Sequence, residues 1–172
     1  AWHKSAYPDK ALAEADALLA ARPHDPYFLE LKGQILLESG RPADALPALR
    51  EAVRLTNSQP LIAVLLSHAL IATEDDRNFA EAETVLRAAV NRDRENPFAW
   101  YQLGVVYEHR GDLPRAALAT AERFSMEGNN AMAERSAATA MEGLKPGIND
   151  YLRAQDIAMV ARGAMEKKRK KK

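Results

Sequence analysis

The chain has 172 residues, of which 47% are apolar, and this is enough to bury a core within one ordinary domain. Only 6% of the residues are aromatic and alanine is abundant, which favours closely packed helices and argues against a β-sandwich. The lack of cysteine excludes disulfides and thiolate metal sites. The 24 basic and 24 acidic residues balance, but the final KKRKKK supplies six of the basic ones, so the remainder is mildly acidic and has no general attraction for nucleic acid.

The most apolar run, residues 61–72 (LIAVLLSHALIA), is shorter than the roughly 20 residues that a membrane span needs. It predicts a buried helix, and we expect no transmembrane segment. No signal peptide precedes the first helical pattern, and the chain begins with Ala1. We therefore expect that a segment upstream of Ala1 has been removed.

The chain begins with half of a repeated unit. Ala11, Ala15 and Leu18 fit the second helix of such a unit, and Trp2 then falls in the first helix, which the sequence enters part-way. We interpret residues 1–24 as a truncated half-unit and expect the first five residues to be poorly packed.

Three unit openings follow in register at Pro26, Pro60 and Pro97. The first two are 34 residues apart, and the next interval is 37 because about three residues are inserted near residues 73–77. These intervals predict units at residues 25–58, 59–95 (with the short insertion) and 96–127.

The third unit carries the clearest pattern, NPFAWYQLGVVYEHRGDLPRAAL at residues 96–118. Trp100, Leu103, Gly104 and Tyr107 have the spacing of one helix face, while Asn96 can cap that helix with a proline in its first position. The pattern closely resembles the tetratricopeptide repeat (TPR), a helix-turn-helix unit of about 34 residues.

The repeat becomes irregular beyond residue 127. Residues 128–146 are predicted to form a degenerate half-unit, residues 147–165 a capping helix, and residues 166–172 a disordered basic tail. The predicted fold is all-α, a right-handed α-α superhelix (TPR solenoid) of about nine helices.

Glycines are expected to have two roles in this fold. Gly33 and Gly104 should let paired helices approach closely, so Gly104→Leu should overpack the contact at a cost of about 1–3 kcal/mol. Gly40, Gly111 and Gly128 should occupy turns that need positive φ.

The sequence contains no recognised catalytic or metal-binding motif, so we expect these residues to form no enzyme active site and to hold no cofactor. His68 is interpreted as a groove or packing residue rather than a metal ligand or base. The carboxylates at residues 74–76 are interpreted as a solvated acidic turn in the inserted loop. The basic tail is interpreted as solubilising, with low-specificity binding to RNA, an anionic membrane or an acidic partner as the alternative.

The TPR resemblance implies a concave groove built from positions 2, 5, 9 and 12 of each first helix. Eight of these twelve positions are apolar or aromatic, which predicts that a protein or peptide segment covers them. The alternative is that the final helix of the chain folds back and fills the groove. The twelve positions are Tyr27, Glu30, Gln34, Leu37, Leu61, Val64, His68, Ile71, Phe98, Tyr101, Val105 and Glu108.

A more specific resemblance covers nearly the whole chain. The segments at residues 26–55, 96–112, 117–129 (ALATAERFSMEGN) and 151–157 (YLRAQDI) together resemble the C-terminal TPR region of bacterial, BepA-like zinc metallopeptidases of the HtpX and CAAX-prenyl-protease clan. This resemblance implies a larger periplasmic zinc metalloendopeptidase, whose zinc and catalytic residues lie outside this chain.

The partners implied by the resemblance are outer-membrane protein substrates, their assembly machinery, or the attached protease domain. The alternative is a free-standing TPR adaptor with no protease domain.

Overall fold

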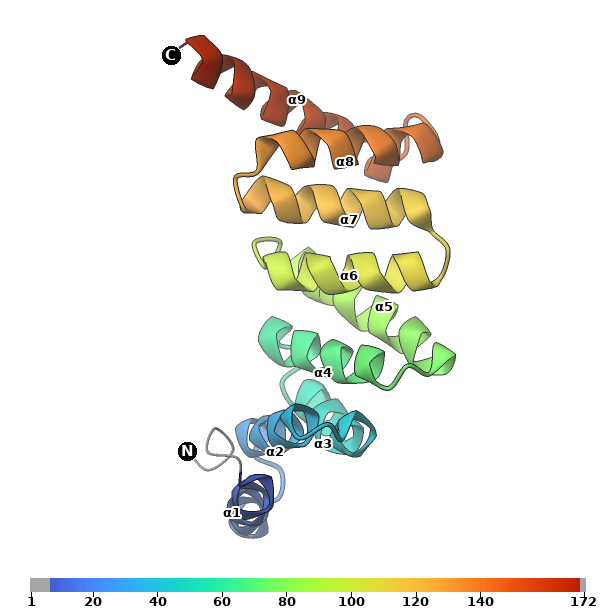
Figure 1. Ribbon diagram of the computed structural model, residues 1–172. Coiled ribbons are helices and arrows are strands. Elements are labelled where there is room, and N and C mark those ends of the chain that lie inside the picture. The colour runs from blue at the N-terminus through green and yellow to red at the C-terminus, as the bar shows by residue number, and fades with distance from the viewer. Residues whose placement is uncertain (1–6, 171–172) are drawn as a thin grey trace. The chain divides into compact units, whose positions relative to one another are not determined.

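The computed structural model describes residues 7–170, and within this range it contains nine α-helices and no β-strand (Figure 1). The predicted all-α fold is therefore confirmed. The helix expected around Trp2 lies outside the described residues. None of the helices between residues 7 and 170 is long and apolar enough to cross a membrane.

The helices form two compact units, which divide between Arg92 and Asp93. The first unit contains α1 (Pro8–Ala21), α2 (Pro26–Glu38), α3 (Pro42–Leu55), α4 (Pro60–Ala72) and α5 (Asp76–Arg92). The second contains α6 (Pro97–His109), α7 (Leu113–Met126), α8 (Asn130–Gly143) and α9 (Asn149–Lys170).

The helix starts follow the predicted capping chemistry. The Asn96 side chain accepts a hydrogen bond of 3.1 Å from the backbone N–H of Ala99, and Pro97 occupies the first turn of α6. Asp25 caps α2 in the same way by accepting from the N–H groups of Tyr27 and Phe28. Each cap satisfies backbone donors that have no partner within the helix, and proline lacks the donor altogether.

The predicted positive-φ glycines are confirmed. Gly111, for example, has φ 76° after α6, and the next residue, Asp112, donates its N–H to the carbonyl of Tyr107 at 2.9 Å. This left-handed closure satisfies a carbonyl at the end of the helix and turns the chain into α7. Gly40 and Gly128 have φ values of 71° and 72°.

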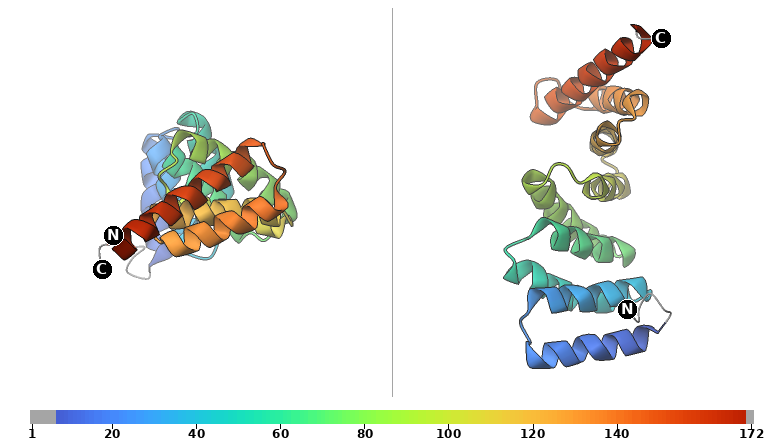
Figure 2. Two further views of the ribbon diagram at one scale, coloured as in Figure 1. Left: turned by 90° about the horizontal axis from the view of Figure 1, so that it is seen from above. Right: turned by 90° about the vertical axis from the view of Figure 1, so that its left-hand side faces the viewer.

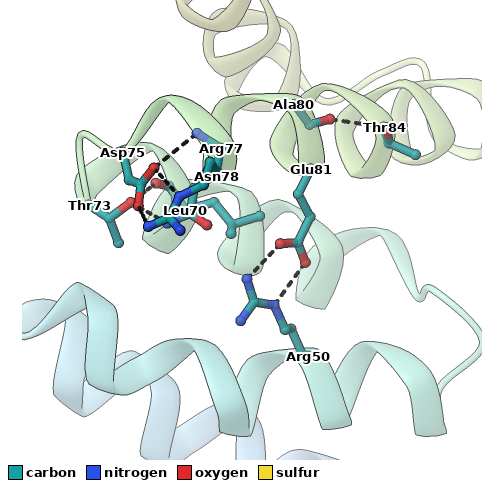
Figure 3. A network of polar contacts seen from close by, with 9 residues as sticks. All are labelled: Arg50, Leu70, Thr73, Asp75, Arg77, Asn78, Ala80, Glu81 and Thr84. Atoms are coloured by element: carbon teal, nitrogen blue, oxygen red, sulfur yellow. Dashed lines mark hydrogen bonds and ion pairs between the residues drawn. The ribbon is translucent and has the colours of Figure 1, made fainter.

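The predicted inserted loop is instead part of a helix. The α4–α5 connection has three residues, as the α2–α3 connection does, and α5 is 17 residues long where α3 has 14. Asp75 caps the added turn by accepting from the backbone N–H of Arg77 at 3.0 Å, and Asn78 donates to the Thr73 hydroxyl at 2.7 Å (Figure 3). The acidic turn therefore has a capping role, and the Arg77 side chain, which donates to Asp75, lowers the pKa of that carboxyl.

A bidentate ion pair joins α3 to α5 in the first unit. Arg50 donates to both carboxylate oxygens of Glu81, at 2.9 and 2.6 Å (Figure 3). Both side chains are partly exposed, so this pair contributes less to stability than the buried alanine and leucine residues of the same helices.

In the second unit α9 packs along α8 and also contacts α7 (Figures 1 and 2). Its buried face is made of small and aliphatic residues, Ala154, Ile157, Ala158 and Ala161, which join a cluster with residues of α7 and α8. The alternative in which the final helix covers α6 is not supported within this unit, because α9 lies on α7 and α8.

The predicted disordered tail is wrong for most of its length. The capping helix continues to Lys170, beyond the predicted end at residue 165. No proline follows Gly163, lysine and arginine are good helix formers, and cations are favourable near a helix C-terminus. Lys171 and Lys172 lie outside the described residues.

Candidate functional site

The twelve predicted groove residues fall on three helices. Eight of them lie on α2 and α4 in the first unit, and four lie on α6 in the second.

On α2 and α4 the apolar or aromatic predicted positions that are exposed are those that directly follow the opening prolines. Tyr27 is 66% exposed and Leu61 is 61% exposed, whereas Leu37 and Ile71 are half-buried. Val64 differs from the prediction because it is buried, so a partner could not reach it in this structure. His68 is exposed on α4. No group of three histidine, aspartate or glutamate side chains in residues 7–170 could hold a metal ion.

The polar predicted positions on α2 are partly buried. Gln34 donates to Glu38 at 2.8 Å along the helix. Burial raises the pKa of Glu30, because a carboxylate loses hydration when it leaves water.

We expect Glu30→Gln to stabilise the first unit at neutral pH. The raised pKa in the folded state means that the ionised carboxylate is disfavoured there, whereas the glutamate of the unfolded chain has its ordinary, lower pKa. The carboxylate therefore lowers the free energy of unfolding at pH values above its folded-state pKa. This destabilisation disappears as the pH falls below the pKa of the unfolded state, where Glu30 is protonated in both states. Urea unfolding at neutral and acid pH measures this, and a stability difference that does not change with pH would contradict it.

In the second unit α6 and α7 enclose a cleft of about 270 Å³. Three predicted groove residues line it, namely Tyr101, Val105 and Glu108. Phe98, the fourth predicted residue on α6, stacks against Tyr101 with ring centroids 6.2 Å apart. The cleft is completed by residues that sequence analysis did not place in the site: Gly104, Leu113, Ala116, Ala117, Thr120 and Arg123.

The two ends of the cleft differ in charge. At one end Arg123 lies with its guanidinium carbon 5.8 Å from the Tyr101 ring centroid and 4.2 Å from that of Phe124. At the other end the exposed Glu108 lies near Leu113, where α6 gives way to α7. Tyr101 is 52% exposed and Phe98 is 46% exposed, so the aromatic rim is accessible to a partner.

Two departures from the repeat pattern open this cleft. In the first unit Leu49 fills the space over Gly33, where an added Cβ would lie 2.4 Å from the Leu49 side chain. Thr120 occupies the position in the third repeat that Leu49 occupies in the first. The nearest atoms to an added Cβ at Gly104 are accordingly 3.7 Å away, and the expectation that Gly104 is needed for close helix approach is wrong.

Arg123 is the second departure. Its position is filled by Ala52 in the first repeat and by Ala89 in the second, and both alanines are buried. An alignment of the second helices of the three repeats would have shown that Thr120 and Arg123 differ from the leucine and alanine at the same positions of the other two repeats. The groove positions considered in the sequence analysis came only from first helices.

Comparison with known families accounts for this arrangement of helices. The sequence profile of the tetratricopeptide repeat matches residues 8–60 and 72–125. The chain belongs to the tetratricopeptide repeat family. The second TPR match covers α6 and all but the last residue of α7, and it ends before α8.

Solved structures with a similar TPR fold include MamA, which has 24% sequence identity and a TM-score of 0.69 over 97% of this chain and 94% of that one. Another is TTC0263, a thermophilic TPR protein of Thermus thermophilus, with 22% identity and a TM-score of 0.55 over 92% of this chain and 94% of that one. At these identities the similarity establishes the fold alone. A search of the curated proteins finds no significant match. TPR units are binding scaffolds for protein or peptide partners rather than catalytic folds.

Proposed function

We propose that this TPR protein binds a segment of a protein partner, anchored by an apolar side chain in the α6–α7 cleft. The observation that carries the proposal is the cleft that Gly104 and Thr120 line, where Thr120 stands at the repeat position that the buried Leu49 has in the first repeat. The cleft lies next to the exposed aromatic residues Phe98 and Tyr101, and together they form an apolar surface that a ligand can cover.

The size of the cleft favours a side chain over a separate small molecule. Pockets for drug-sized ligands usually have volumes of about 300–1,000 Å³, and the α6–α7 cleft has about 270 Å³. It suits one or two large apolar side chains of a peptide, while the rest of the peptide would lie along the surface. Tyr101 and Phe98 offer rigid aromatic contact area, which is typical of interface hot spots.

The charges give the bound segment a preferred direction. Arg123 favours an acidic residue beside the apolar anchor at one end, and Glu108 favours a basic residue at the other. Arg123 also lies 3.2 Å from Glu127, so an acidic ligand residue would compete with that exposed pair. Such pairs contribute little to stability, typically below about 1 kcal/mol, so the exchange is feasible.

Filling the cleft tests the proposal. Thr120→Leu restores the leucine that the first two repeats carry at this position, as Leu49 and Leu86, both fully buried. We expect peptides selected from a phage-displayed library on the wild-type chain to bind Thr120→Leu at least about tenfold more weakly. The melting temperature should stay the same or rise, because the new side chain buries apolar surface.

The matched control is Thr139→Leu, the same substitution at an exposed position of α8 in the same unit. Peptide binding should be unchanged in this variant. Tyr101→Ala supplies an independent test, since it removes the aromatic rim without filling the cleft. If neither Thr120→Leu nor Tyr101→Ala weakens binding of the selected peptides, the cleft is not the binding site.

We further propose that this module belongs to a larger, BepA-like zinc metallopeptidase of the periplasm, with zinc held in a separate protease domain. The support is the sequence resemblance at residues 26–55, 96–112, 117–129 and 151–157. The ligand would then be an outer-membrane protein substrate, its assembly machinery or the protease domain itself. An immunoblot of fractionated source cells tests this: a periplasmic or membrane-associated band well above 19.0 kDa supports it, and a band near 19.0 kDa supports a free-standing adaptor.

A further inference from the structure

The terminal helix α9 has apolar side chains on the side that faces away from α7 and α8. We call Leu152, Met159 and Val160, together with Ile148 directly before the helix, the outer face of α9. Their exposed fractions range from 38% for Ile148 to 65% for Met159, whereas Ala154, Ile157 and Ala161 on the opposite side are buried. Large apolar residues gathered on one exposed helix side are unusual for a surface that meets only water.

Basic residues continue this face toward the C-terminus. Met159 and Lys170 are eleven residues apart, and Val160 and Lys167 are seven apart, so each pair lies on one side of the helix. Because α9 continues to Lys170, Lys167 and Lys170 have fixed positions around the helix axis, which residues of a disordered tail would not have. The final turns of α9 also project past the end of α8 (Figures 1 and 2).

The charge of this segment is strongly one-sided. The six basic residues of KKRKKK against Glu166 give the last seven residues a net charge of +5. Two acidic residues, Asp156 and Glu166, also lie on the outer side, since Glu166 follows Met159 by seven residues. Asp156 is close enough to Arg153 to contribute to the raised pKa of that guanidinium. Arg162 pairs with Glu134 of α8 at 2.8 Å and belongs to the packing of the unit.

We infer that the outer face of α9, with its lysine-rich end, binds the surface of an anionic phospholipid membrane. Apolar side chains would enter the boundary between headgroups and acyl chains while the lysine ammonium groups meet lipid phosphates. The helix lies on the membrane rather than across it, in keeping with the finding that no helix in the described range could span one.

The geometry favours a lipid surface over a protein partner. The outer face is the convex side of a single helix, and a Cβ at Gly163 would meet no atom within 4 Å. Such a face offers no concave site for an anchoring side chain, whereas a fluid planar surface needs none. Clusters of four to eight basic residues beside apolar helix positions are a sequence pattern typical of binding to acidic lipids.

Vesicle co-sedimentation of the full chain tests the inference. We expect binding to phosphatidylcholine vesicles that contain about one third phosphatidylglycerol, little binding to pure phosphatidylcholine, and loss of binding in about 0.5 M salt. Met159→Ser with Val160→Ser should weaken binding about tenfold, because both side chains would otherwise leave water. Lys167→Gln with Lys170→Gln should weaken it about 25-fold, at roughly fivefold per lysine.

The matched control is Lys168→Gln with Arg169→Gln, which removes the same two charges from other sides of the helix. It should have a clearly smaller effect. Circular dichroism should show unchanged helix content in all three variants, because every substituted side chain is exposed.

Three results would overturn the inference. The first is equal or absent binding to both vesicle types. The second is binding that depends on the lysines but not on Met159 and Val160, which would indicate electrostatic adsorption only. The third is self-association of the chain through Met159 and Val160 without vesicle binding, which would assign the outer face to a second copy.

Discussion

Arg153→Met is expected to destabilise the second unit by about 2–3 kcal/mol, because it leaves a buried carboxylate without its partner. Glu122 on α7 is 4% exposed, and its two carboxylate oxygens accept hydrogen bonds of 2.5 and 2.7 Å from Arg153 on α9. The same hydrogen bonds raise the pKa of Arg153. Chemical unfolding should measure the lower free energy of unfolding. Amide hydrogen exchange should show that α9 opens more often than in the wild type.

Replacing the other partner of the ion pair provides the control. Glu122→Met should cost less, about 1 kcal/mol, because the Arg153 side chain is 44% exposed and can return to water. The double variant should recover much of the loss, since two apolar side chains replace a pair that has to be desolvated. Equal effects of the two single variants, or strict additivity in the double variant, would show that the buried carboxylate does not determine the stability of the α7–α9 contact.

The predicted architecture rested on signals that act locally. The Asn96 cap, the proline after it and the positive φ of Gly111 depend on neighbouring residues and on backbone sterics, so the sequence pattern was enough to place them. The spacing of apolar residues likewise predicted the buried side of α6, on which Leu103 and Tyr107 are buried. Capping, proline placement and positive φ do not depend on which neighbouring helix packs against the segment.

The features that were missed depend on pairs of helices. A Cβ at Gly33 would collide with Leu49, whereas a Cβ at Gly104 would make only ordinary contacts, because Thr120 stands where the first repeat has Leu49. A motif search within one helix cannot detect this, since glycine is present in both first helices. The same limit explains Val64, which the repeat positions assigned to the groove and which is buried.

The length of α9 was missed for a different reason. A run of lysines is usually solvated and disordered, and composition therefore predicted a tail after residue 165. The helix is already formed and packed through Ala161, so its extension needs no new nucleation. The difference matters for function because it places Lys167 and Lys170 on the side of Met159 and Val160.

Gly33→Ala should destabilise the first unit by about 1–2 kcal/mol, whereas Gly104→Ala should stabilise the second by about 0.5–1 kcal/mol. Both glycines lie inside first helices at the same repeat position, and alanine is the better helix former at each. At Gly33 the new methyl group would lie 2.4 Å from both Cγ and Cδ2 of Leu49, a fully buried side chain that cannot move into solvent. At Gly104 the nearest atoms are 3.7 Å away, an ordinary van der Waals distance.

Thermal unfolding of the two variants in the full chain, together with hydrogen exchange to locate the change, would measure the contrast. Because the helix-propensity gain is common to both, the difference between them isolates the steric cost of crowding Leu49. Gly104→Leu, which the repeat pattern alone predicts to be destabilising, should be tolerated because its side chain can extend into the open α6–α7 cleft, and it should weaken peptide binding as Thr120→Leu does. If Gly104→Ala proved as destabilising as Gly33→Ala, the cleft would be closed in solution and the proposed anchor site would have no room for a ligand side chain.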